Sequence, residues 1–96
     1  MVIGVLKIEL YMNGNRSLKE KRQVLRSLIQ RIKSRYSNVS ISEVDSNDLW
    51  QKATLGISFV SNEKPFVNSI LDQVLRFIDS MGIVDIVQRE REIFHF

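Results

Sequence analysis

Basic side chains able to bind phosphate are concentrated in one stretch of this 96-residue chain. The segment from Arg16 to Tyr36, RSLKEKRQVLRSLIQRIKSRY, holds eight of the fourteen Lys and Arg residues and one acid, Glu20. Its formal charge is therefore +7, whereas the remaining residues carry six bases and ten acids, a charge of −4. Lys and Arg fixed on one surface neutralise the phosphates of a polyanion and release its counterions. The charge distribution thus favours a polyanion such as RNA as a partner.

The basic segment has the pattern of one long amphipathic helix. Ser17 and Glu20 are spaced as a capping box, which marks a helix start. Apolar residues fall in an arc of roughly 140° at 3.6 residues per turn and predict the core face: Leu18, Leu25, Leu28, Ile29, Ile32 and Tyr36, with Val24 at the margin. One flank within roughly 60° is expected to carry Lys19, Arg22, Arg26 and Lys33, and the other Lys21, Arg31 and Arg35.

Six of these side chains are the predicted nucleic-acid contacts: Arg16, Lys19, Lys21, Arg22, Arg26 and Lys33. Arg31 and Arg35 are expected to contribute through the long-range field. The near absence of acidic partners one turn away favours a polyanion surface. The alternative is that the basic side chains only solvate the helix and pack their aliphatic stems on the core margin.

A loop with the sequence DSNDLWQ, from Asp45 to Gln51, is the second candidate site. Trp50 is the only tryptophan and is able to stack on a base or another ring, while Asp48, Gln51 and Lys52 offer hydrogen-bonding groups. The favoured alternative is that Leu49 and Trp50 cover one end of the core and Asp48 caps the turn. Glu43 and Asp45 are expected on one strand face near Asp48, but acids clustered in a turn are usually solvated, so no metal site is predicted.

No arrangement of residues indicates catalysis. The chain has no cysteine and no glycine-rich phosphate loop, and its single histidine, His95, has no Cys or Ser motif to act on. We therefore expect a non-enzymatic protein without a cofactor. Sheet-face stacking of RNA bases is disfavoured, because the exposed positions of the central strands are expected to carry Lys7, Glu9, Thr54 and Ser58 rather than aromatic rings.

The elements that position these sites follow the order βαββαβ. Alternating apolar residues predict strands from Val2 to Met12, from Val39 to about Val44, around residues 54–59, and from Ile83 onward. The second helix is expected to start at Asn62 as its cap and to end at Gly82. This order predicts a single α+β domain over residues 1–96: a ferredoxin-like sandwich with a four-stranded antiparallel sheet, both helices on one face, and the first and third strands central.

The sequences at the two ends of the chain predict a strand at each end. MVIGVLKIEL alternates in polarity, has no basic leader, and is therefore predicted to be a strand rather than a signal peptide. No apolar run reaches the roughly 20 residues that cross a bilayer, so we expect a cytoplasmic protein without a membrane partner. At the other end, the last strand is expected to continue past the charged run QRERE, with Phe94 or Phe96 packed on the sheet or on a dimer partner.

Two motifs, RSLKEKR at residues 16–22 and EVDSNDLWQKATLG at residues 43–56, resemble the YlxP-like family of small bacterial proteins, a domain of unknown function. The resemblance covers nearly the full length, although the ending IFHF is more aromatic than the family pattern. It implies a ferredoxin-like domain in the bacterial cytoplasm, with genes often beside those of translation-initiation and ribosome-maturation factors, and no catalytic residue. A non-enzymatic RNA- or ribosome-associated domain is therefore the leading hypothesis. The alternative is a protein-interaction module that forms a homodimer through its open sheet face (Ile3, Val5, Val60) or its C-terminal strand.

Overall fold

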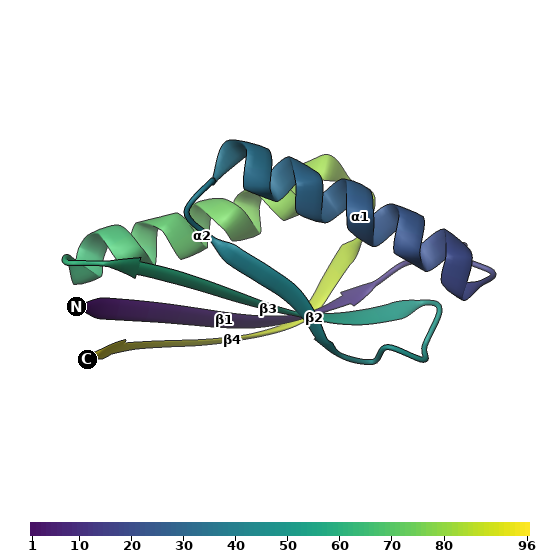
Figure 1. The fold of residues 1–96 in the computed structure, drawn as a ribbon. Helices are drawn as coiled ribbons and strands as arrows, with labels where there is room; N and C mark the ends of the chain where they lie inside the picture. The colour runs from purple at the N-terminus through teal and green to yellow at the C-terminus, as the bar shows by residue number, and fades with distance from the viewer.

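The computed structural model describes all 96 residues and contains two helices and four strands. In chain order these are β1 (Val2–Tyr11), α1 (Leu18–Arg35), β2 (Ser40–Asp45), β3 (Lys52–Ser61), α2 (Lys64–Met81) and β4 (Asp85–His95). The strands form one antiparallel sheet in the order β2-β3-β1-β4, and both helices cover the same face of it (Figure 1). The predicted ferredoxin-like arrangement, with the first and third strands central, is confirmed.

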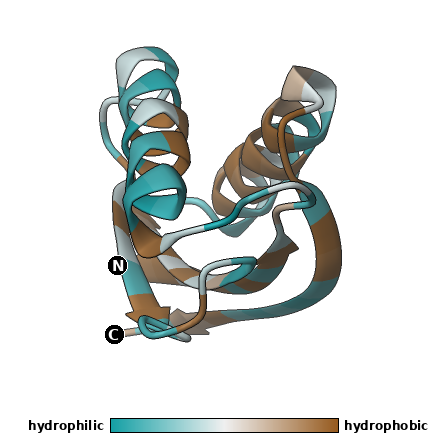
Figure 2. Ribbon diagram, turned by 90° about the vertical axis from the view of Figure 1, so that its right-hand side faces the viewer, coloured by the Kyte–Doolittle hydropathy of each residue, from teal (hydrophilic) through white to brown (hydrophobic).

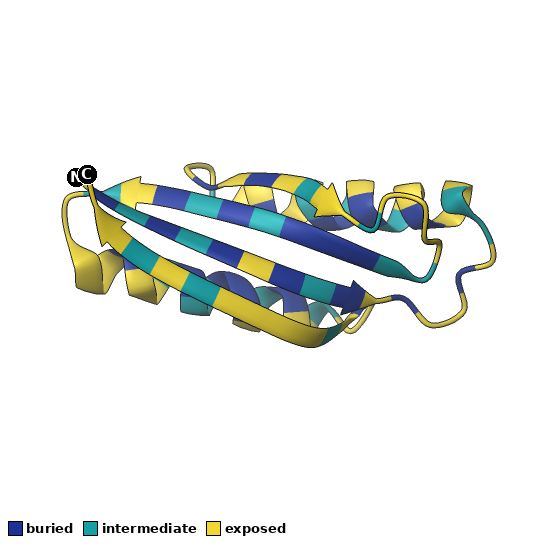
Figure 3. Cartoon of the chain, turned by 90° about the horizontal axis from the view of Figure 1, so that it is seen from below, coloured by how far each residue is buried: buried dark blue, intermediate teal, exposed yellow.

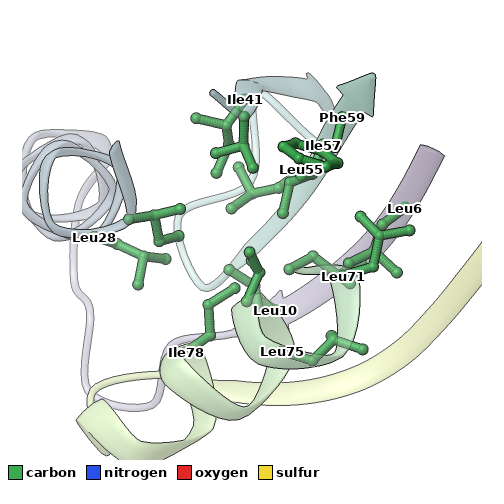
Figure 4. Close-up of a cluster of buried hydrophobic side chains, with 14 of the residues drawn as sticks. Leu6, Leu10, Leu28, Ile41, Leu55, Ile57, Phe59, Leu71, Leu75 and Ile78 are labelled. Atoms are coloured by element: carbon green, nitrogen blue, oxygen red, sulfur yellow. The ribbon is translucent and has the colours of Figure 1, made fainter. Parts of the chain in front are cut away.

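The core lies between the sheet and the helices. Successive β1 side chains alternate between the two faces, so Leu6, Ile8 and Leu10 point to the helices and are at most 2% exposed. Apolar residues of both helices and of β3 meet them there, among them Leu28, Leu55, Leu71 and Ile78 (Figure 4). Figure 2 shows the hydrophobic sides of the two helices turned toward the sheet and toward each other. The polar side of α1 therefore has a fixed outward direction.

The helix ends follow the sequence signals with one exception. The backbone N–H of Glu20 donates to Ser17 Oγ at 3.1 Å, so the Ser17 cap is confirmed. Glu20 also reaches back as expected, and its Oε2 accepts from the N–H of Arg16, the residue before the cap, at 2.6 Å. Gly82 ends α2 with φ of 68°, as predicted. The prediction of Asn62 as the cap of α2 is wrong: Glu63 holds that position, and its carbonyl accepts from the Val67 N–H at 3.1 Å.

A bulge in β2 changes the direction of its last side chains. Glu43 lies opposite Leu55 on the helix side, whereas Asp45 lies opposite Thr54, so Val44 is the extra residue. The expectation that Glu43 and Asp45 share one strand face is therefore wrong, because the bulge reverses the alternation between them. Glu43 continues the regular alternation of β2 and faces α1, whereas the bulge turns Asp45 to the other face.

The other face of the sheet is uncovered (Figure 3). The prediction that the last strand runs on toward the terminus is confirmed, since β4 reaches His95. Phe94 lies opposite Ile3 on the uncovered face and is 40% exposed. Phe96 does not pack on the sheet: it is 85% exposed, while its backbone N–H donates to the Met1 carbonyl at 2.8 Å. The two chain ends are thus side by side.

Gly4 offers a direct test of how closely α2 packs on the sheet. A Cβ at this position would overlap the Val67 side chain and crowd Leu71, both on α2. We expect Gly4→Ala to lower the free energy of unfolding by about 1–3 kcal/mol, because α2 must shift to admit the methyl group. Urea denaturation measures the change. Ser40→Ala, at an exposed position of edge strand β2, is the control and should leave stability within about 0.5 kcal/mol of the parent. An unchanged Gly4→Ala midpoint would contradict this packing.

Candidate functional site

Seven basic side chains in and next to α1 are exposed and unpaired: Arg16, Lys19, Arg22, Arg26, Arg31, Lys33 and Arg35. The three ion pairs of the molecule involve other cations, namely Lys21, Lys52 and Arg91. The positive charge of the segment is therefore presented to solvent without compensating carboxylates. Five of the six predicted nucleic-acid contacts belong to this exposed set.

The exposed cations of α1 divide between two surfaces. Lys19, Arg22, Arg26 and Lys33 recur at three-, four- and seven-residue spacing and form one row, which we call the basic stripe. From its first to its last residue it spans about 21 Å at 1.5 Å per residue, comparable to several phosphate spacings. The stripe matches the flank expected from the sequence.

Arg31 and Arg35 instead lie beside two hollows between the helices. Arg31 lines the first, of about 440 Å³, and Arg35 and Phe77 line both this one and the second, of about 380 Å³. The guanidinium carbon of Arg35 lies 5.1 Å from the centre of the Phe77 ring, and Arg76 of α2 lines the second hollow. Arg76 adds a cation that sequence reasoning missed. Its helix is nearly charge-balanced, and only the packing of α2 against α1 brings it to this groove.

Lys21 is the main departure from the sequence prediction. Its side chain is buried, with the residue 1% exposed, and its ammonium donates to the carbonyl oxygens of Ser46 and Leu49, each at 2.6 Å. Glu43 Oε2 lies 2.8 Å from the same nitrogen and is itself buried. The prediction that Lys21 stands on an exposed flank is wrong, and its ammonium is not available to a phosphate.

A sequence signal for this burial exists. Lys21 precedes Leu25, Leu28 and Ile32 by four, seven and eleven residues, which is the spacing of a single helix face. The position therefore lies within the apolar arc. An ammonium at such a position needs acceptors from a neighbouring element, and β2 supplies Glu43 while the following loop supplies two carbonyls.

The segment from Ser46 to Gln51, which we call the clamped loop, is held at several points. Besides the two bonds from Lys21, the Asn15 side-chain amide donates to the Trp50 carbonyl at 3.2 Å, and the Gln51 amide donates to the Asn15 carbonyl at 3.3 Å. The Met12 N–H donates to the Gln51 carbonyl at 2.7 Å. The loop is thereby joined to the first turn of α1 and to the segment that precedes it.

The four predicted ligand-loop residues have different environments. Asp48 and Trp50 are exposed, Trp50 by 47%, whereas the Gln51 amide is engaged with Asn15. Lys52 Nζ lies 3.5 Å from Glu9 Oε1 on the uncovered sheet face. The favoured expectation that Leu49 and Trp50 cover the core is wrong. Their carbonyls are drawn inward by Lys21 and Asn15, and Leu49 is 48% exposed.

The acids near the loop do not gather around one point. No group of three or more His, Cys, Asp or Glu side chains is close enough to hold a metal ion, and Glu43 is paired with Lys21. Neither helix has the length and apolar character required to cross a membrane.

Comparisons with known proteins give a family and a fold. Residues 3–91 match the family described as "Protein of unknown function (DUF503)". The "Uncharacterized protein YlxP" of Bacillus subtilis (strain 168) is 40% identical over 84 residues, which cover 88% of this chain and 90% of that protein. Among solved structures, the chain is similar to the de novo designed protein Foldit4, with a TM-score of 0.53 and 11% identity over 99% of this chain and 97% of that one. It is also similar to the designed ferredoxin-fold protein LFR1 1, with a TM-score of 0.53 and 13% identity over 100% of this chain and 88% of that one. These structural likenesses concern the fold alone.

Lys21→Met should test whether the buried ammonium holds the loop. The substitution keeps an apolar stem but leaves Glu43 and two carbonyls without their donor, so we expect a loss of about 3–5 kcal/mol in the free energy of unfolding. Urea denaturation gives the value. Adding Glu43→Met to Lys21→Met should recover part of the loss, because the unpaired carboxylate is then removed. Equal stability of Lys21→Met and the parent would contradict the clamp.

Proposed function

This chain belongs to the DUF503 family of proteins of unknown function, and we propose that it is a non-catalytic RNA-associated domain that binds through the basic stripe of α1. The observation that carries the proposal is the row of exposed cations without acidic partners on a helix whose orientation is fixed by its packed face. Such a row presents a continuous field to a phosphate backbone. Its contacts would be independent of base sequence.

The absence of acids beside the stripe argues against a purely solubilising role. A solvated helix face gains stability from Glu–Lys pairs one turn apart, and like charges at the same spacing cost stability. Arg22 and Arg26 stand one turn apart with the same charge and no carboxylate partner. A bound polyanion would relieve that repulsion, so the arrangement fits a surface that is occupied in use.

The uncovered sheet face lacks the side chains that would bind RNA bases. A base-stacking sheet needs aromatic rings on its central strands. β1 and β3 instead carry Lys7, Glu9 and Ser58 toward that face, with Tyr11 alone at one end. Lys52 is also paired with Glu9 there. The helix layer is therefore the side that we assign to RNA.

A salt titration of RNA binding tests this proposal. We expect the protein to bind structured ribosomal RNA at low salt, with log K falling against log salt at a slope of about −3 if four cations contact phosphates. Arg22→Glu combined with Arg26→Glu should weaken binding strongly and reduce the slope by about half. Filter binding or fluorescence anisotropy of labelled RNA gives both quantities.

The matched control reverses two exposed cations elsewhere, Lys64→Glu with Arg89→Glu, and changes the net charge by the same amount. It should retain most of the affinity, because neither residue belongs to the stripe. Absence of binding at low salt would remove the proposal. So would equal effects of the two charge reversals, since net charge alone would then explain them.

A second candidate function, self-association through the open sheet face, is favoured by one observation. Ile3 lies directly opposite Val60 on one side and Phe94 on the other, which makes an apolar row across three strands. Val60 is 53% and Phe94 40% exposed. A face of four strands about 4.8 Å apart and about 34 Å long offers about 600 Å² per copy. Two copies would bury about 1,200 Å², the lower limit of specific interfaces.

The C-terminal strand is a poor alternative route to a dimer. Arg89 and Arg91 point to the helix side of β4, whereas Glu90 and Glu92 point to the open side. If two β4 edges paired as antiparallel strands about a two-fold axis, directly opposed side chains would lie on the same face of the sheet. The arginines of one copy would then meet the arginines of the other, and the glutamates would meet the glutamates. The occupant that we propose for the sheet face is therefore a second copy stacked face to face.

Sedimentation equilibrium tests the dimer. We expect reversible association of the parent protein that Val60→Asp abolishes, because the carboxylate would be buried in the apolar row. Ile83→Asp is the control: Ile83 is an exposed apolar residue that precedes β4 and does not belong to the sheet, so its substitution should leave association unchanged. A parent protein that stays monomeric at high concentration would exclude this function.

A further inference from the structure

The clamped loop holds large apolar side chains in solvent on a fixed backbone. Leu49 and Trp50 are about half exposed, although a side chain of this size gains about 1.5–3 kcal/mol when it is fully buried. Their backbone is fixed by Lys21 and Asn15 rather than left mobile. A rigid loop loses little conformational entropy on binding, which favours affinity. These features together are those of a binding loop.

The loop lies against the N-terminal end of α1, the end at which the basic stripe begins. Lys21, in the first turn of α1, donates to the Leu49 carbonyl, and Asn15, next to exposed Arg16, donates to the Trp50 carbonyl. Lys19 begins the stripe two residues before Lys21, at the same end of α1 but on its exposed side. Trp50 is therefore placed at the end of α1 where the surface assigned above to the RNA backbone begins.

Charge gives a nucleotide one orientation at this boundary. The clamped loop and its preceding residue contain two acids and no base, Asp48 and Asp45, whereas the helix side carries Arg16 and Lys19. A phosphate is thus repelled from the loop and attracted to the helix. A base carries no net charge and is not repelled by these acids, so it is the part of the nucleotide that can contact the loop. Asp48 is exposed two residues from Trp50 and able to accept from a base N–H.

Trp50 is better suited to stacking than the aromatic residues of the interhelical groove. Phe77 is half-buried, and the Arg35 guanidinium lies over its ring at 5.1 Å, while Tyr36 packs edge-on against Phe77 with ring centres 5.9 Å apart. No aromatic pair or cation–π contact involves Trp50. Its indole is therefore a free stacking surface at the end of α1 where the basic stripe begins.

We propose that the clamped loop binds an unpaired base of the RNA, with Trp50 stacked on the base and Arg16 and Lys19 on the adjoining phosphates. This inference rests on the proposed function and adds the substrate class to it: a structured RNA with a single-stranded extension. The basic stripe follows the structured part, and the loop takes the first unpaired nucleotide. Lys21 acts as a positioning residue that keeps the indole in place.

Trp50 itself provides the measurement, because it is the only tryptophan of the chain. An RNA hairpin with a short single-stranded tail is compared with the same hairpin with a blunt end. We expect the tailed hairpin to quench Trp50 fluorescence and to bind about 5- to 150-fold more tightly, the range of one base–aromatic stack. The blunt hairpin should bind through the stripe with little quenching.

Variants separate stacking from general affinity. Trp50→Leu should abolish the preference for the tail and leave binding of the blunt hairpin unchanged, while Trp50→Phe should keep part of the preference. Phe96→Leu, which removes another highly exposed ring, is the control and should behave as the parent. The two substituted positions are exposed, so all three variants are expected to fold, and circular dichroism verifies it.

The outcomes distinguish this inference from the proposed function. If both hairpins bind in a salt-dependent manner, yet Trp50→Leu keeps the full preference for the tail or no preference exists, the loop inference is wrong and the basic stripe stands. If neither hairpin binds at low salt, the proposed function fails and the inference fails with it. Loss of the tail preference in Trp50→Leu alone supports the inference.

Discussion

The buried ammonium of Lys21 is the interaction on which the surface of this protein depends. Removing a lysine charge from water is costly unless its donors find acceptors, and here two carbonyl oxygens and one carboxylate lie within 2.8 Å. These three acceptors belong to β2 and the clamped loop, whereas the donor belongs to α1. One side chain therefore joins the helix, the edge strand and the loop. It sets the direction in which the loop side chains point.

That constraint separates the charges and the apolar residues of the molecule. Packing of the apolar arc, with Lys21 inside it, turns the basic stripe to the outside of the helix layer. The carboxylates are mostly elsewhere, and Glu90 and Glu92 point to the uncovered sheet face. A modest net charge of +3 thus conceals one strongly basic surface. The two proposed activities use opposite sides, RNA the helix layer and a second copy the sheet face, so they do not compete for residues.

The sequence predicts the fold well because the fold depends on periodicity. Strand alternation, the apolar arc of α1, the capping box at Ser17 and the left-handed Gly82 are local signals, and each one holds. The site depends on contacts between segments far apart in the chain, which local signals do not encode. Lys21 was expected to be exposed because it is charged, although its spacing from Leu25 and Leu28 marks a buried face. Glu43 meets it by the regular alternation of β2, but the Ser46 and Leu49 carbonyls that complete its contacts follow a bulge that the sequence does not reveal. The side chain of Trp50 is exposed because the backbone carbonyls of its loop turn inward.

The central claim is that RNA occupies the helix side of the domain, and amide chemical-shift mapping by NMR tests it most directly. The ¹⁵N-labelled protein is titrated with a tailed RNA hairpin at low salt, and the perturbed backbone amides are placed on the structure. The account predicts changes along residues 16–33 and in the clamped loop at residues 46–51, with β4 and the open face of β1 and β3 unaffected. Perturbations confined to the sheet face, or none at saturating RNA, would contradict it.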